Sequence, residues 1–178
     1  KAQPKYLPAW AGLAEAHLAL NQDDEAIAAL ERGLALDPSR ADTKARLDLL
    51  RFRQVPRLIA AGIRAREAGD HAEARRILTR ALALSPTSGV ILREVALAEL
   101  DAGALADAER HARRAIEADR DDALAHATLG AVLEAGGNIR GAAAAYRRAA
   151  SLDPRTEWGA RAEALREQTE AAATPAEF

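Results

Sequence analysis

The segment Ala123–Thr156, ALAHATLGAVLEAGGNIRGAAAAYRRAASLDPRT, decides the fold of this chain. It contains two short stretches in which apolar residues recur with helical periodicity. The tripeptide GGN at 136–138 separates the two stretches, and Pro154 ends the second one, because proline cannot continue a helix. The segment therefore predicts a hairpin of two helices joined by a tight turn.

The same pattern recurs earlier in the chain at a fixed spacing, equal to the length of this segment. Each copy places a small residue in its first helix, where two helices must touch, and an alanine twelve positions later. These pairs are Ala14 and Ala26, Gly62 and Ala74, Ala96 and Ala108, and Gly130 and Ala142. A fixed period of this length predicts a solenoid of stacked hairpins, with full repeats at 7–40, 55–88, 89–122 and 123–156.

One interval breaks this period. The distance in sequence from Pro38 to Pro86 exceeds one repeat by fourteen positions, and we assign the extra residues to 41–54. They add about four helical turns, or roughly 21 Å, so the faces of the helix stay nearly aligned. We expect a long helix from near Ala41 to Ala68, bent or locally broken at Pro56. Two separate helices, broken at 54–56, are the alternative.

The repeated residues match a known pattern, W-x2-L-G-x2-Y, then A-x3-F, then P. The first repeat carries it at Trp10, Leu13, Ala14, Ala26, Leu30 and Pro38, and the last at Leu129, Gly130, Leu133, Ala142, Tyr146 and Pro154. The chain resembles tetratricopeptide-repeat (TPR) proteins. The third repeat departs from the pattern, because Arg120 replaces the closing proline and Glu99 occupies a site usually held by an aromatic residue.

The resemblance implies an all-α, right-handed superhelical solenoid of four TPR helix-turn-helix repeats. We expect residues 157–172 to form a capping helix, because the end of a solenoid needs a polar outer face. Residues 173–178 are expected to be a tail. Residues 1–6 read as the end of a preceding repeat, which predicts that the chain is an excerpt of a longer protein.

Composition excludes several classes of function. There is no cysteine, so the chain has no disulfide, thiolate zinc site or cysteine nucleophile. No apolar run approaches the length of a membrane-spanning helix. The net charge of −2 conceals a basic region at 40–80, with 11 basic and 5 acidic side chains. Abundant alanine and arginine, with only three lysines, favour a bacterial source, and the compartment, cytoplasm or periplasm, stays open.

No catalytic constellation is visible, and we expect neither a cofactor nor a metal. The four histidines lack the spacing of metal ligands. Gly136 and Gly137 lack the context of a phosphate-binding loop. His17 and His126 occupy sites at which the family usually has aromatic residues, so packed or hydrogen-bonded roles are expected for both.

The resemblance also implies a concave groove, lined by the first helices of the repeats, that receives a protein or peptide. We refer to these residues as the predicted groove: Ile59, Ile63, Arg66, Val90, Arg93, Leu97, Leu100, Asp101, Leu124, Ala127, Ala131 and Glu134. Its apolar character favours an amphipathic helix or an apolar segment. Family members that bind chaperone C-terminal carboxylates have lysine and asparagine where this chain has Ala11 and Glu15, so that mode is not supported.

Four arginines share one face of the long helix. Arg46, Arg53, Arg57 and Arg64 are spaced at intervals of 7, 4 and 7, within roughly 20° of one line at about 100° per residue. They either solvate an exposed helix face or form a cleft for an acidic partner. Nucleic acid is disfavoured, because the chain is acidic overall and the arginines are not interleaved with aromatic residues.

These observations support three hypotheses of function. The first is a non-catalytic protein–protein interaction scaffold that binds a peptide or helix in its concave groove. The second is the recognition arm of a larger enzyme, such as a transferase. The third is a self-assembly element that stacks end to end through its N-terminal face into a homo-oligomer. For the groove itself, the alternative to a partner is that missing parts of the same protein, or another copy, fill it.

Overall fold

The computed structural model describes residues 7–173, in which the chain forms nine helices and no strand. The helices are α1 (Leu7–Ala19), α2 (Asp23–Leu36), α3 (Ala41–Glu67), α4 (His71–Leu84), α5 (Gly89–Asp101), α6 (Leu105–Ala118), α7 (Ala123–Ala135), α8 (Ile139–Leu152) and α9 (Trp158–Ala173). The predicted all-α class is confirmed. The predicted end of a preceding repeat, 1–6, and residues 174–178 of the tail lie outside the described residues, and the division into four repeats remains a prediction.

The chain divides into two compact units, Lys1–Arg57 and Leu58–Phe178, and the division falls within α3. α3 is one continuous helix with Pro56 inside it, so the alternative of two helices does not occur. Proline removes only one backbone hydrogen bond and costs a few kcal/mol in a helix interior. The long helix α3 accommodates Pro56 without a break.

In Lys1–Arg57, the first half of α3 packs on the α1–α2 hairpin. Leu47 and Leu50 are each 3 % exposed and belong to one apolar cluster with residues of both other helices. Gln54, one turn further along the same face, donates a hydrogen bond to Asp24 at the start of α2. Residues 41–54 of α3 therefore cover the apolar face of the α1–α2 hairpin.

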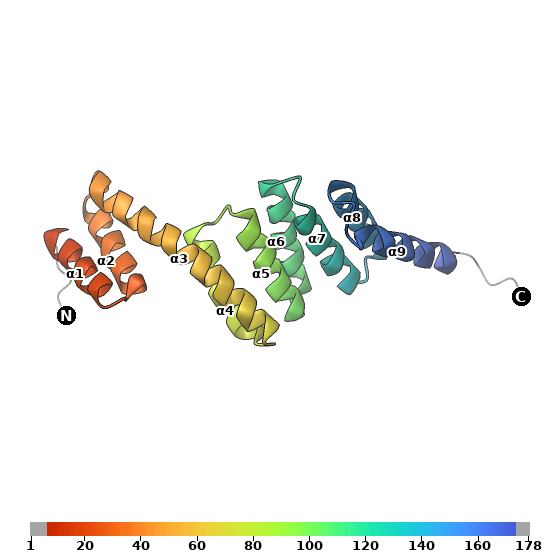
Figure 1. The fold of residues 1–178 in the computed structure, drawn as a ribbon, viewed down its shortest axis with the longest axis horizontal. Helices are drawn as coiled ribbons and strands as arrows, with labels where there is room; N and C mark the ends of the chain where they lie inside the picture. Colours follow the sequence, from red (N-terminus) through yellow and green to blue (C-terminus); the bar gives the residue numbers. More distant parts are fainter. Residues whose placement is uncertain (1–6, 174–178) are drawn as a thin grey trace, which may run out of the picture. The chain divides into compact units, whose positions relative to one another are not determined.

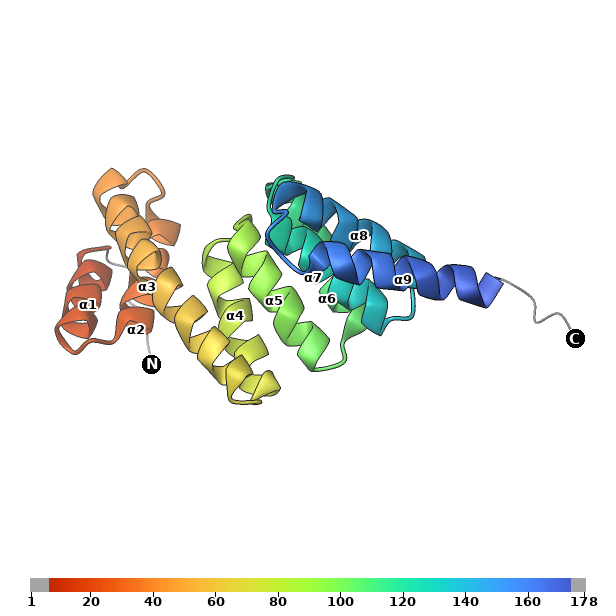
Figure 2. The same ribbon diagram turned by 45° about the vertical axis from the view of Figure 1, so that its right-hand side comes forward.

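In Leu58–Phe178, the helices pack in chain order. α4 contacts α5, each helix from α5 to α8 contacts the next, and both ribbon views show α5 to α9 side by side (Figures 1 and 2). α5 also contacts α7, so the first helices of successive hairpins form one layer. α9 buries Ala162 and Leu165 in the cluster that contains α7 and α8 residues. The remaining side of α9 is mostly exposed.

The turn inside each hairpin contains one residue with a positive φ. Three of these are glycines at equivalent places in successive repeats, Gly69, Gly103 and Gly137, with φ between 73° and 79°. In the first hairpin the residue is Asn21, with φ of 56°, and asparagine tolerates this conformation better than most residues. Asp70 and Asn138 then cap the following helices through their side chains.

The two helices of a hairpin approach closely where the first helix carries a very small residue. A Cβ placed on Gly62 would lie 2.5 Å from Cγ of Leu78, and one on Gly130 would lie 3.0 Å from three ring atoms of Tyr146. Leu78 is fully buried. Burial also raises the pKa of the Tyr146 hydroxyl. The small residues thus leave the space that the large residues of the second helices fill.

The α5–α6 hairpin buries a polar pair instead of an aromatic side chain. Oε2 of Glu99 lies 2.7 Å from Nδ1 of His111, and both side chains are about one-tenth exposed. The equivalent residues of the next hairpin, one repeat later, are Leu133 and Ala145. Oε2 of Glu99 and Nδ1 of His111 are therefore hydrogen-bond partners for each other, at a place where the next hairpin has apolar side chains.

Replacing Gly62 by alanine should destabilise the protein by about 1–3 kcal/mol, because the new methyl group forces Leu78 out of its position. The higher helix propensity of alanine, worth about 1 kcal/mol, offsets only part of this cost. Urea unfolding gives the change in free energy. Gly159→Ala is the matched control, since its Cβ would lie 3.7 Å from Cβ of Ala150. Equal stability of the two variants would contradict the close contact.

Replacing Glu99 by leucine alone should cost about 1–3 kcal/mol, because His111 then loses its buried partner. Replacing both residues, as in Glu99→Leu with His111→Ala, should restore most of the stability, since a buried polar pair can often be exchanged for apolar residues. A double-mutant cycle in urea measures the coupling. If the losses of stability of the two single variants simply add in the double variant, the contact between Glu99 and His111 is not what makes Glu99→Leu destabilising.

Candidate functional site

The predicted groove residues all lie on α3, α5 and α7, within the unit Leu58–Phe178. Val90 and Leu124 are the most exposed of their large apolar side chains, at 47 % and 51 %. Each is the second residue of its helix, so the two occupy equivalent places in successive repeats. Five more apolar residues are half-buried, namely Ile59, Ile63, Leu97, Leu100 and Ala131, whereas Ala127 is buried.

The charged residues of the predicted groove are paired with charges on neighbouring helices. Nη1 of Arg66, on α3, lies 3.5 Å from Oδ2 of Asp101, on α5, so the structure brings these two predicted residues together. Glu134, on α7, accepts hydrogen bonds from Arg161 on α9, with Nε at 3.1 Å from Oε2. These pairs neutralise the surface and leave its exposed apolar side chains as the main features available to a partner.

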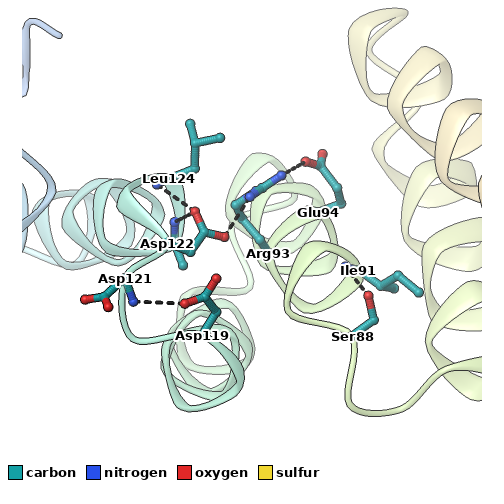
Figure 3. A network of polar contacts seen from close by, with 9 residues as sticks. Ser88, Ile91, Arg93, Glu94, Asp119, Asp121, Asp122 and Leu124 are labelled. Atoms are coloured by element: carbon teal, nitrogen blue, oxygen red, sulfur yellow. Dashed lines mark hydrogen bonds and ion pairs between the residues drawn. The ribbon is translucent and has the colours of Figure 1, made fainter. Parts of the chain in front are cut away.

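Arg93 belongs to a largely buried network (Figure 3). Its Nη1 donates a hydrogen bond of 2.8 Å to Oδ2 of Asp122, and its Nη2 lies 3.5 Å from Oε1 of Glu94. Oδ1 of Asp122 accepts the backbone N–H groups of Leu124 and Ala125, which caps α7. The three charged side chains are only 10–16 % exposed. Arg93 thus links α5 to the start of α7 and is not a free cation for a ligand.

Trp158 is a surface residue that our sequence reasoning missed. It follows Leu124 by one repeat length, just as Leu124 follows Val90, and this spacing was the available signal. Trp158 is half-buried at the start of α9, packed against the core of α7 and α8. It also lines a surface hollow with Tyr146 and Arg161. Trp158 therefore corresponds to Val90 and Leu124 in sequence spacing, and its side chain contacts the core of α7 and α8.

The four arginines of α3 differ in their surroundings. Arg46 pairs with Glu15 at 2.9 Å, and Arg57 pairs with Asp23 at 3.5 Å. Arg53 and Arg64 are exposed and have no ion-pair partner among residues 7–173. The first three belong to Lys1–Arg57 and Arg64 to Leu58–Phe178. The cleft for an acidic partner stays a prediction.

His17 and His126 each make a local hydrogen bond. Nδ1 of His17 lies 2.7 Å from Oε1 of Gln22, and Nε2 of His126 lies 3.0 Å from the carbonyl oxygen of Arg120. These hydrogen bonds confirm the roles expected for both residues. In the described part of the chain, no group of three metal-type side chains gathers, and no helix is both long and apolar enough to cross a bilayer.

Solved structures share this fold. The TPR domain of Sgt2 from Aspergillus fumigatus aligns over 70 % of this chain and 87 % of its own, with a TM-score of 0.65 and 21 % identity. The TPR domain of OM64 from Arabidopsis aligns over 66 % of this chain and 98 % of its own, with a TM-score of 0.62 and 21 % identity.

A third structure, the first TPR of Spaghetti (RPAP3) bound to the HSP90 peptide SRMEEVD, aligns over 68 % of this chain and 95 % of its own, with a TM-score of 0.61 and 23 % identity. Comparison with curated protein sequences gives no match. The sequence model of the tetratricopeptide repeat matches residues 1–47 and 65–132, which is more than half of the chain. The chain therefore belongs to the tetratricopeptide-repeat family.

Proposed function

We propose that the chain is a non-catalytic scaffold that binds a peptide or a helix of another protein in the predicted groove. The exposed row of Val90 and Leu124 carries this proposal. Exposed apolar side chains at equivalent places on adjacent helices form a continuous surface, and such a surface often marks an interaction site. Membership of a repeat family with a peptide-bound relative of the same fold supports the same function.

The chemistry of the surface indicates the kind of partner. The pairs Arg66–Asp101 and Arg93–Asp122 use up charges that could otherwise bind a ligand. Leu97 and Leu100, half-buried on α5, add apolar area beside Val90. An apolar segment, or an amphipathic helix that presents apolar residues three and four positions apart, would complement this surface.

Aspartate at Val90 and Leu124 should abolish this binding while changing the free energy of unfolding by only about 0.5 kcal/mol, because both side chains are exposed. The probe is a short peptide selected from a phage-displayed random library on the full chain, with affinity measured by fluorescence anisotropy. Leu36→Asp is the matched control, since Leu36 is 48 % exposed on α2. Undiminished binding to the double variant would rule out the groove.

The peptide SRMEEVD, which the solved relative binds, should not bind this chain saturably. The sites at which chaperone-binding family members carry lysine and asparagine hold Ala11 and Glu15, and the Glu15 carboxylate already pairs with Arg46 at 2.9 Å. A carboxylate there would repel the acidic peptide rather than attract it. Calorimetric titration tests this expectation. Saturable binding that disappears when the peptide's C-terminus is amidated would overturn it.

A further inference from the structure

α3 exposes large apolar side chains on the face opposite to its buried one. Leu49 is 56 % exposed and Phe52 is 76 % exposed, whereas Leu47 and Leu50 are each 3 % exposed. All four belong to the unit Lys1–Arg57. Leaving a phenylalanine side chain in water forgoes the stabilisation of about 1.5–3 kcal/mol that its burial would provide. This face is therefore a candidate for a contact that the isolated chain does not make.

The exposed apolar residues form one stripe. Ala45, Leu49, Phe52 and Pro56 are separated by intervals of 4, 3 and 4 and are all exposed. This spacing keeps them on one side of the helix over about three turns, or roughly 17 Å. Alternating intervals of three and four are the pattern by which one helix packs lengthwise against another. We refer to these four residues as the α3 stripe.

Arginines border one flank of the α3 stripe. Arg46, Arg53 and Arg57 directly follow Ala45, Phe52 and Pro56 in the sequence. The pairs Arg46–Glu15 and Arg57–Asp23 have side chains up to 68 % exposed. Ion pairs on the surface contribute little to the free energy of folding. Arg53 has no ion-pair partner in residues 7–173. The opposite flank carries one acidic and one basic side chain, Asp48 and Lys44, so only the arginine flank has a clear net charge.

The α3 stripe lies almost entirely outside the family pattern. The tetratricopeptide-repeat model matches residues up to 47 and resumes at 65, so it omits Leu49, Phe52 and Arg53. The stripe is a property of the insertion that lengthens α3. Its function is therefore not implied by the repeats.

We propose that the α3 stripe docks an acidic amphipathic helix of a partner protein, as a second interaction surface separate from the predicted groove. Apolar residues of that helix would cover Leu49 and Phe52, and its carboxylates would face Arg46, Arg53 and Arg57. A second copy of this chain fits the charges less well. In an antiparallel pair the arginine flanks would face each other, and in a parallel pair they would meet Asp48 together with the like-charged Lys44.

Two synthetic helical peptides test the proposal on the full chain. Both carry leucines at alternating intervals of three and four, and the flanking positions are glutamate in one and lysine in the other. The glutamate peptide should bind, more weakly as salt rises, and the lysine peptide should not. Phe52→Ala should weaken binding roughly tenfold, as loss of an aromatic anchor does. Arg53→Glu should weaken the glutamate peptide and strengthen the lysine peptide.

Control variants separate this surface from the predicted groove. Leu36→Ala, at another exposed leucine, and Val90→Asp with Leu124→Asp should leave the affinity for the glutamate peptide unchanged. Conversely, Phe52→Ala should leave binding of the library-selected groove peptide unchanged. The α3 proposal can therefore fail while the groove proposal stands, and the reverse.

Several results would overturn the α3 proposal. Equal binding of the two peptides, or binding that ignores Phe52→Ala, would show that the stripe does not select an acidic helix. A concentration-dependent dimer in sedimentation experiments that Phe52→Ala abolishes would identify a second copy as the occupant. Binding to phosphatidylcholine–phosphatidylserine vesicles that the same variant abolishes would identify a lipid surface instead.

Discussion

Close approach of the two helices in each hairpin is the constraint on which the rest of the structure depends. It requires a very small residue on the first helix, and in two of the hairpins a large side chain of the second helix faces that residue. Gly62 facing Leu78 and Gly130 facing Tyr146 meet this requirement. Because so much of the interior is alanine and glycine, the helices gain stability from dense contact between backbones and small side chains rather than from bulky apolar groups. The order of the hairpins along the chain follows from that contact, since each leaves an apolar face for the next.

The two halves of the long helix α3 make different contacts. Its first half closes the α1–α2 hairpin through Leu47 and Leu50, and its second half places Gly62 against Leu78 in α4. On the side of α3 opposite to Leu47 and Leu50, Leu49 and Phe52 are 56 % and 76 % exposed. The predicted insertion at 41–54 therefore both packs on the first hairpin and presents an uncovered apolar side.

The charged side chains differ in how deeply they are buried and in whether they are paired. On the first helices of the second unit, arginines pair with carboxylates of the next hairpin, as in Arg66 with Asp101 and Arg93 with Asp122. The burial of the second pair makes it part of the architecture, because an unpaired charge there would be costly. In the first half of α3, Arg46 and Arg57 are in exposed ion pairs, and Arg53 is exposed and has no ion-pair partner among residues 7–173. Charges exposed in this way are the ones available to select an external partner.

The structure decided that α3 continues through Pro56, which the sequence had left open. The sequence by itself determined the all-α class and the repeating order of the hairpins. These properties depend on local periodicity and on small residues at repeated places, which can be read without coordinates. Tertiary structure alone decided that Glu99 meets His111, that Arg93 is tied to Asp122 and that Phe52 faces solvent. Side chains on different elements meet only through packing, and a helical pattern shows which face is apolar but not which apolar face stays uncovered. The physical reason is that periodicity is local, whereas burial and charge pairing depend on which helices lie next to each other.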